Sequence, residues 1–333
     1  MKYSPPFQLT HTMMGLVADI SELIGLWTAS NANRLVPKLR RENRIKTIQA
    51  SLAVEQNTLS IEQVTAVIEG KTVLGTPKEI QEVHNAFAAY EAMENWNPLE
   101  AEDLLSAHNI LMTGLVTNAG SWRTDGTGIY RGTELVHMAP PAGQVPRLMY
   151  QLIDWLSETE AHPLIASAAF HYEFEFIHPF SDGNGRMGRL WQTLILSHWQ
   201  PLLAFLPVET VIREKQQDYY HWLSHADAQS DSTKFIEFLL SAIKEALNEA
   251  IEIDQSSSKT LAKTQDQTLV KTKEKTPDKI LRILKSHPDM NLSEVAYNIN
   301  RSVSAVERAV AKLKKENRLS YHGPKKNGHW KVH

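Results

Sequence analysis

The chain has 333 residues, more than one typical domain requires, so its length predicts at least two folded units. Hydrophobic residues make up 42%, enough for a sizeable core, and the absence of cysteine excludes disulfides and thiolate chemistry. The formal net charge of −3 is unevenly spread: residues 271–333 carry fifteen Lys and Arg against six Asp and Glu, a net of +9, which leaves −12 for residues 1–270. A basic segment on an acidic body makes the C-terminal part the candidate for contact with DNA.

Membrane and export signals are not found in the sequence. The N-terminal residues contain no apolar stretch of the signal-peptide type, and no run of about 18 apolar residues occurs. The sequence therefore predicts a soluble, cytoplasmic protein without a membrane partner.

Helical periodicity dominates the first 250 residues and predicts a mainly α fold. Apolar residues recur at three- and four-residue steps, as in residues 14–27 and 148–156. Residues 128–138 break this pattern, because Gly132 separates two short β-prone arms and so predicts a hairpin. Such a hairpin is either a flap over a functional site or an ordinary surface turn.

Residues 251–276 are polar and predict a linker, and a second pattern begins at Pro277. Three short helices and a two-stranded hairpin over 277–333 predict a small α+β domain of the winged helix-turn-helix type. It would bind DNA through the third helix and the wing, using Arg301, Ser304, Glu307, Arg308, Lys312, Lys325 and Lys326. Winged helices also serve as protein-contact and dimerisation modules, so a homodimer is a further expectation.

Residues 178–189 read His-Pro-Phe-Ser-Asp-Gly-Asn-Gly-Arg-Met-Gly-Arg and carry the most chemistry in the chain. His178 can take up a proton near neutral pH, and Asp182 is a hard oxygen ligand of the kind that Mg²⁺ prefers. Gly183 and Gly185 let backbone N–H groups around Asn184 approach anionic oxygens.

Arg186 and Arg189 complete this segment. They lie three residues apart, so both share one face if the segment continues as a helix, and residues 190–199 then form an apolar helix that carries the loop. A Gly-Asn-Gly sequence alone would indicate only a surface turn. The whole segment instead predicts a nucleotide-using transferase. It is not a P-loop, because no Gly-Lys-Ser/Thr follows, and it is not a Rossmann turn, because a helix precedes it.

The segment resembles the signature of the Fic (Fido) family, His-x-Phe-x-Asp/Glu-Gly-Asn-Gly-Arg-x-x-Arg, and the resemblance extends over roughly residues 10–250. It implies a Fic-type helical bundle with a β-hairpin flap, divided into an N-terminal helical region (1–100) with an inhibitory helix and a catalytic core (101–250). Phe180 is expected to anchor the loop in the core. Related Doc toxins carry Lys where this chain has Gly185, so glycine there favours AMP transfer over phosphoryl transfer.

The resemblance also implies an activity. The protein would transfer AMP from ATP to a Ser, Thr or Tyr hydroxyl of a target protein docked along residues 128–138, with His178 as general base and Mg²⁺ on Asp182. The nucleotide would be bound by Asp182, Gly183, Asn184, Gly185, Arg186, Gly188 and Arg189. Tyr219 and Tyr220 are candidates for the adenine side, although aromatic pairs on a helix are usually core.

An inhibitory glutamate is a further implication, because family members carry Ser/Thr-x-x-x-Glu-Gly/Asn. Residues 65–70 match these letters with Glu69, whereas residues 51–56 have Gln56 in place of glycine. The surroundings of Ser51 and Glu55 are more like the inhibitory helix of the family, so Glu55 is expected to pair with Arg189. The alternative for either glutamate is a solvated helical charge.

Other functions stay open at this point. The protein could be a DNA-binding transcriptional regulator with a Fic body as sensor, or a Fic transferase of another phosphate-linked group. Removal of AMP is an expected second activity.

Overall fold

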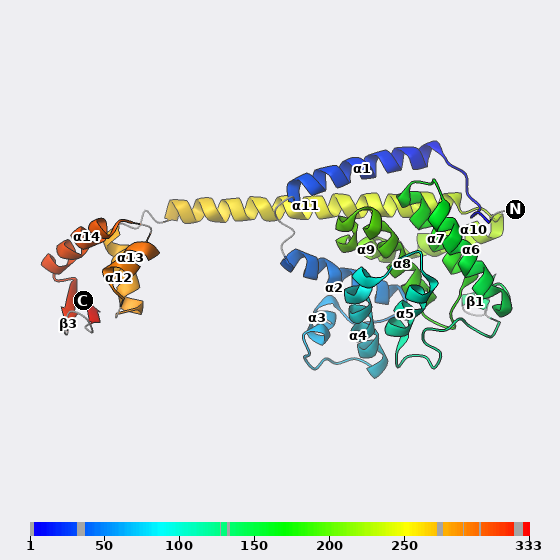
Figure 1. Ribbon diagram of the computed structural model, residues 1–333, viewed down its shortest axis with the longest axis horizontal. Helices are drawn as coiled ribbons and strands as arrows, with labels where there is room; N and C mark the ends of the chain where they lie inside the picture. The colour runs from blue at the N-terminus through cyan, green and yellow to red at the C-terminus, as the bar shows by residue number, and fades with distance from the viewer. Residues whose placement is uncertain are drawn as a thin grey trace. The chain divides into compact units, whose positions relative to one another are not determined.

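The computed structural model describes residues 3–31, 37–126, 128–131, 134–271, 276–288, 290–299, 301–322 and 329–333 (Figure 1). The chain divides into two compact units, Met1–Asp254 and Gln255–His333, and each has its own hydrophobic core. Among the described residues, no helix is both long and apolar enough to cross a membrane.

The first unit is helical apart from one hairpin. Its α-helices are α1 (His11–Asn31), α2 (Pro37–Val54), α3 (Ile61–Ile68), α4 (Pro77–Ala92), α5 (Ala101–Met112), α6 (Val145–Glu158), α7 (Pro163–Ile177), α8 (Asn184–Trp199), α9 (Val208–Glu214), α10 (Gln216–Gln229) and α11 (Thr233–Lys271). Short 3-10 helices are η1 (Met93–Asn95), η2 (Ala142–Gln144) and η3 (Pro201–Phe205). Helix α11 continues past the boundary of the unit and through most of the segment predicted as a linker.

Helices α7 and α8 form the buried centre of this unit. Side chains are buried continuously from Leu164 to Phe174 on α7 and from Arg186 to Leu196 on α8, as expected for helices surrounded by other helices. Gly188 lets the two helices approach closely, because a Cβ atom there would lie 2.7 Å from Glu175 Oε1. Gly188 therefore packs against α7, and the nucleotide contact expected from the sequence stays a prediction.

Helix α1 confirms the helical periodicity predicted over residues 14–27. Its apolar side has Ile20, Ile24 and Trp27 in the core. In Figure 1 it runs beside α11, and Lys244 Nζ on α11 pairs with Asp19 Oδ2 at 2.7 Å.

The hairpin predicted over residues 128–138 is confirmed. Strand β1 (Gly128–Arg131) pairs antiparallel with β2 (Glu134–Met138), and the register shifts between Ile129 and Tyr130. Gly132, the expected turn residue, lies outside the described residues.

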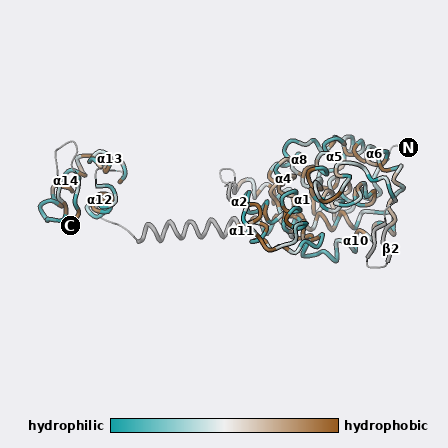
Figure 2. The backbone as a smooth tube through the Cα atoms, turned by 90° about the horizontal axis from the view of Figure 1, so that it is seen from below, coloured by the Kyte–Doolittle hydropathy of each residue, from teal (hydrophilic) through white to brown (hydrophobic). Residues whose placement is uncertain are grey.

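The second unit consists of α12 (Thr276–Ser286), α13 (Leu292–Asn298), α14 (Val303–Lys315) and the antiparallel strands β3 (Leu319–His322) and β4 (His329–Val332). Figure 2 shows hydrophobic and hydrophilic stretches alternating along these helices, as in amphipathic helices. Apolar side chains of all three helices and both strands meet in the core, among them Ile280, Val295, Val310 and Trp330. Lys325 and Lys326, the predicted wing tip, lie outside the described residues.

Candidate functional site

The loop between α7 and α8 has two left-handed residues that determine its course. His178 ends α7 with φ 50°, its N–H donating to Phe174 O at 2.9 Å, and Gly183 precedes α8 with φ 83°. A Cβ atom at Gly183 would lie 2.6 Å from Met112 Sδ, so only glycine fits. The loop thus delivers a partly exposed histidine and the N-terminus of a buried helix to one place.

Asn184 fixes the shape of this loop. Phe180 N donates to Asn184 Oδ1, and Asn184 Nδ2 donates to Phe180 O, both at 2.9 Å. Both ends of the buried amide are therefore used inside the loop, and the expected contact of Asn184 with nucleotide stays a prediction. The backbone N–H groups in the first turn of α8 have no intrahelical acceptor, a feature of helix starts that can bind anions.

Phe180 anchors the loop in the core, as expected from the sequence. Its buried ring stacks on His108 at a centroid distance of 3.6 Å and on Trp122 at 5.2 Å. His108 Nδ1 accepts from Gly120 N at 2.9 Å, so in the neutral ring Nε2 carries the proton and donates to Asp182 O at 3.1 Å. Burial lowers the pKa of His108 to about 4, which keeps the ring neutral at physiological pH.

Arg123 supports the other end of the loop. Its Nε donates to His178 O at 2.7 Å, its backbone N donates to Pro179 O at 2.9 Å, and its Nη2 donates to Ile177 O at 3.3 Å. The side chain is buried, so these hydrogen bonds hold the backbone at His178 in place from inside the protein.

Arg189 lies on α8 beneath the end of α2. Its Nη2 donates to Glu55 Oε1 at 2.8 Å and to Ser51 O at 2.9 Å, and its Nε donates to Ser51 Oγ at 3.0 Å. Arg189 is only 1% exposed. Burial by itself lowers the pKa of Arg189, but the adjacent Glu55 carboxylate outweighs it and keeps the pKa above its ordinary value. The guanidinium is therefore a fixed positive charge.

Gly185 makes room for the Glu55 carboxylate. A Cβ atom at residue 185 would lie 2.3 Å from Glu55 Oε1, so a side chain there would displace the carboxylate. The Glu55 carboxylate thus occupies space directly above the first turn of α8.

Glu69, the competing candidate, lies elsewhere. It is at the end of α3, where its carboxylate pairs with Lys71 at 2.7 Å and with Arg41 at 3.6 Å. Of the two segments that fit the inhibitory pattern, only the one containing Ser51 and Glu55 contacts Arg189.

Arg186 has two carboxylate partners. Its Nη1 lies 3.2 Å from Glu82 Oε1 on α4, and its Nη2 lies 3.3 Å from Asp182 Oδ1. Asn57 Nδ2 donates to Glu82 Oε2 at 2.9 Å. Arg186 and Glu82 are both buried, so this pair links the loop to the segment that follows Glu55.

Asp182 is the one loop carboxylate open to solvent, with its side chain 50% exposed. Its Oδ1 accepts from Gly183 N at 2.6 Å. Within the described part of the chain, no three His, Asp or Glu side chains gather in a way that could hold a metal ion. Asp182 therefore fits Mg²⁺ only as one ligand beside substrate phosphates and water, which is the usual arrangement for this ion at nucleotide sites.

Tyr219 and Tyr220 have different surroundings. Tyr219 is 1% exposed and its Oη lies 2.9 Å from His171 Nε2, inside a cluster of aromatic rings. Tyr220 is half-buried beside the end of α2, with its Oη 3.5 Å from Val54 O. Tyr219 is thus a core residue, and only Tyr220 has an accessible edge.

Comparisons with known proteins identify this loop. A profile of the Fic/DOC family matches residues 98–196, which include the loop and most of α8. The structure is similar to the crystal structure of a Fic family protein from Desulfovibrio desulfuricans G20, with 47% sequence identity, coverage of 99% of this chain and 98% of that one, and a TM-score of 0.75. The chain belongs to the Fic family.

More distant Fic proteins are similar over part of the chain. The protein adenylyltransferase Fic of Drosophila grimshawi is 26% identical over 228 residues, and this match covers 65% of this chain and 45% of that protein. A Fic domain containing signaling protein from Bacteroides thetaiotaomicron VPI-5482 is 20% identical, covers 72% of this chain and 98% of that chain, and has a TM-score of 0.59, a likeness of fold. The mainly α, Fic-type fold expected from the sequence is thus confirmed.

Gln56 is the position at which the chain departs from the Fic inhibitory pattern. It follows Glu55 at the end of α2 and has φ 70°, a left-handed conformation that favours glycine. Gln56 adopts this backbone conformation at a cost of about 1 kcal/mol relative to glycine.

We expect Gln56→Gly to raise the free energy of unfolding by about 1 kcal/mol, measured by urea denaturation. Gly70 offers the matched reverse change, because it ends α3 with φ 73° and has no heavy atom within 4 Å of an added Cβ. Gly70→Gln should lower the stability by a similar amount. Equal stabilities for Gln56→Gly and the wild type would show that the left-handed glutamine is not strained.

Three residues of the Fic site were not predicted from the sequence: His108, Arg123 and Glu82. Each acts from another part of the chain, as an internal support of the loop or of an arginine. Their only signal in the sequence is a polar residue on an otherwise apolar helix face or turn, which many surface residues share.

Glu82→Gln tests the buried pair directly. We expect it to lower the free energy of unfolding by about 3 kcal/mol, because Arg186 would keep a buried charge without its buried partner. The double variant Glu82→Gln/Arg186→Met should regain much of this loss in a denaturation cycle. Additive losses in the double variant would mean that the two side chains do not interact.

Proposed function

We propose that the Fic unit is a Mg²⁺-dependent protein adenylyltransferase, which transfers AMP from ATP to a hydroxyl group of a target protein. The observation that carries this proposal is the joint position of His178, the N-terminus of α8, and the arginines Arg186 and Arg189 around a single loop. The curated relative named above is a protein adenylyltransferase, and that name supports the same chemistry.

His178 is the proposed general base. It would take the proton from the attacking Ser, Thr or Tyr hydroxyl as this oxygen bonds to the α-phosphorus, while the bond to the bridging oxygen breaks and pyrophosphate leaves. Arg123 supports this role, because its bonds to the His178 and Pro179 carbonyl groups hold the histidine backbone in one conformation.

The phosphates would be bound by the start of α8 and its arginines. The backbone N–H groups at Asn184 and Gly185 suit the α-phosphate, joined by that of Gly183 if it leaves Asp182 Oδ1, and Arg186 and Arg189 suit the β- and γ-phosphates. Asp182 would hold Mg²⁺, which supplies charge neutralisation on the phosphates when it is bound. Tyr220 is the better candidate for the adenine side, because Tyr219 is enclosed by the core.

Glu55 is the proposed brake on this reaction. Its carboxylate accepts a hydrogen bond from Arg189 Nη2 and fills the space above Gly185. The phosphates would need both the guanidinium and this space. A charged partner already in place can compete with a phosphate oxygen for the same guanidinium. Release of Glu55 would then be a condition for AMP transfer, and the same carboxylate could position water for AMP removal.

The hairpin β1–β2 is the proposed docking element for the target. A two-stranded hairpin has a free edge, and an extended target segment can pair with such an edge through its main chain. This mode would accept different target sequences around the modified hydroxyl.

The experiment for this function is the intact mass of proteins incubated with ATP and Mg²⁺. The chain itself, or a protein captured from a lysate, should gain the mass of one AMP. No mass change in wild type or in Glu55→Gly would contradict the proposal.

A second proposed function belongs to Gln255–His333, which we infer binds duplex DNA. Its order of three helices and an antiparallel hairpin supports the winged helix predicted from the sequence. Arg301, Arg308 and Lys312 are all exposed on or beside α14, as are Ser304 and Glu307. This exposed basic side is the specific observation that favours DNA over a purely structural role.

Replacing Arg308 and Lys312 together with alanine should weaken DNA binding by the full chain. The slope of affinity against salt should flatten by roughly one unit per lost phosphate contact, measured by fluorescence anisotropy at several salt concentrations. Replacing Arg282 and Lys285 on α12 with alanine is the control, because it removes the same amount of positive charge from a different helix. Absence of binding at low salt would make this unit a protein-docking surface instead.

A further inference from the structure

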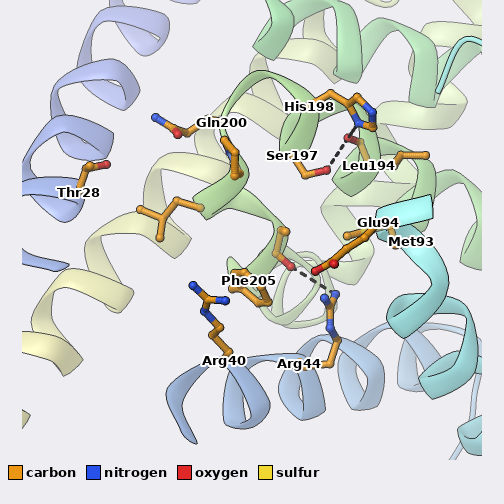
Figure 3. Close-up of a pocket in the computed structure, with 13 residues that line it drawn as sticks. Thr28, Arg40, Arg44, Met93, Glu94, Leu194, Ser197, His198, Gln200 and Phe205 are labelled. Carbon is orange, nitrogen blue, oxygen red and sulfur yellow. Dashed lines mark hydrogen bonds between the residues drawn. The ribbon is translucent and has the colours of Figure 1, made fainter. Parts of the chain in front are cut away.

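A cavity of about 540 Å³ lies away from the Fic loop, among residues of α1, α2, η1, the end of α8 and η3. Figure 3 shows Arg40 and Arg44 reaching from α2 towards Phe205, with Ser197 and Gln200 on the opposite wall. Its volume is in the range of small-molecule sites.

Two guanidinium groups share one aromatic ring in this cavity. The Cζ atom of Arg40 lies 4.9 Å from the Phe205 ring centroid, and that of Arg44 lies 5.3 Å from it. Stacking on a ring stabilises each cation modestly but does not neutralise it. The ring therefore brings two like charges together.

Arg44 is a buried charge without an ion-pair partner. It is 6% exposed, its Nη1 donates a hydrogen bond to Ala204 O at 3.3 Å, and its Cζ also lies 5.2 Å from the Tyr90 ring centroid. Among the described residues, no carboxylate oxygen lies within 4 Å of the Arg40 or Arg44 nitrogens, although Glu94 also lines the cavity. Burial lowers the pKa of Arg44, and Tyr90 together with the more distant carboxylates of Glu91, Glu209 and Glu94 offsets this only in part. Buried charges are normally paired, so this guanidinium lacks a counterion.

We propose that this cavity binds a small organic anion. A phosphate or carboxylate group would lie between Arg40 and Arg44, whose planar forks suit such oxyanions. The apolar body would contact Leu194, Leu202 and Phe205. The Ser197 and Gln200 side chains on the facing wall would supply further polar contacts.

The position of this site on α2 connects it to the brake. Arg40 and Arg44 lie in the first half of α2. Ser51 and Glu55, which bind Arg189, lie at the end of the same helix. A ligand that binds the arrangement seen here, with Glu55 on Arg189, stabilises that arrangement. If the proposed function holds, the bound anion would therefore lower AMP transfer.

Binding is tested by calorimetry on the full chain with phenyl phosphate and phenylacetate, and with benzyl alcohol as a neutral counterpart. At least one anion should bind, and Arg40→Gln should weaken it by about tenfold to a hundredfold, the effect of one lost charge-assisted bond. Arg40 is exposed, so the variant should fold normally. Arg41→Gln is the matched control, because Arg41 does not line this cavity but lines an adjacent one with Arg40 and Arg44, so it also tells the two cavities apart.

The outcomes separate this site from the Fic loop. Loss of binding in Arg40→Gln, with binding kept in Arg41→Gln and Arg186→Gln, supports the cavity. The proposal is overturned if neither anion binds, if benzyl alcohol binds equally well, or if Arg41→Gln or Arg186→Gln loses binding as strongly as Arg40→Gln.

The effect of the anion on the rate of AMP transfer is measured separately from its binding. The bound anion should lower AMP transfer at least twofold in the wild type and leave Glu55→Gly unchanged. Binding without an effect on transfer would overturn the regulatory link and leave the site standing. Absence of transfer in both proteins would count against the proposed function alone, because calorimetry does not depend on it.

Discussion

Replacing His178 with alanine is expected to reduce AMP transfer by about 10² to 10⁴-fold, the usual loss for a missing general base. His178 belongs to the loop that Arg123 and the His108–Phe180 stack hold from beneath, so the rest of the site should stay formed. Transfer is measured with labelled ATP under initial-rate conditions.

ATP binding is the control for this variant. The base acts on the target hydroxyl and not on the nucleotide, so His178→Ala should bind ATP nearly as well as the wild type. Near-normal turnover in His178→Ala would exclude histidine as the base and with it the proposed mechanism.

Glu55→Gly is expected to raise AMP transfer about tenfold to a hundredfold. The variant removes a charge-assisted bond of 2.8 Å to Arg189, and such bonds contribute about 1.5–3 kcal/mol. The freed guanidinium and the space above Gly185 would then be open to phosphate. Automodification followed by intact mass gives the rate.

Glu69→Gly is the matched control, because Glu69 is also a glutamate at a helix end that pairs with basic residues. It should leave the rate unchanged. A larger increase in Glu69→Gly than in Glu55→Gly would reverse the assignment of the brake. If Glu55 also positions water for AMP removal, Glu55→Gly should lose that activity as well.

The sequence predicted those parts of the structure that depend on local pattern. The helices of residues 14–27 follow from apolar spacing, the hairpin from Gly132 and its β-prone arms, and the loop from its glycines. The choice between Glu55 and Glu69 needed family likeness, because the letters alone favour Glu69; the contact with Arg189 agrees with the choice of Glu55.

The rest depends on contacts between distant segments. Glu82 and Arg186 are 104 residues apart, and His178 and Arg123 are 55 apart, so no local pattern links them. Asn184 and Gly188 belong to the sequence motif, and the structure adds contacts that the motif does not reveal: Asn184 closes the loop onto Phe180, and Gly188 packs against α7. A motif gives residue identities, whereas the direction of each side chain follows from the surrounding tertiary structure.

The most direct test of the central claim uses ATP labelled either at the α- or at the γ-phosphate, with the Glu55→Gly protein and Mg²⁺. AMP transfer predicts label on protein from α-labelled ATP only. Label from γ-labelled ATP only would mean phosphoryl transfer, and label from neither would favour a regulator or a different phosphate donor; either result would contradict the proposed adenylyltransferase.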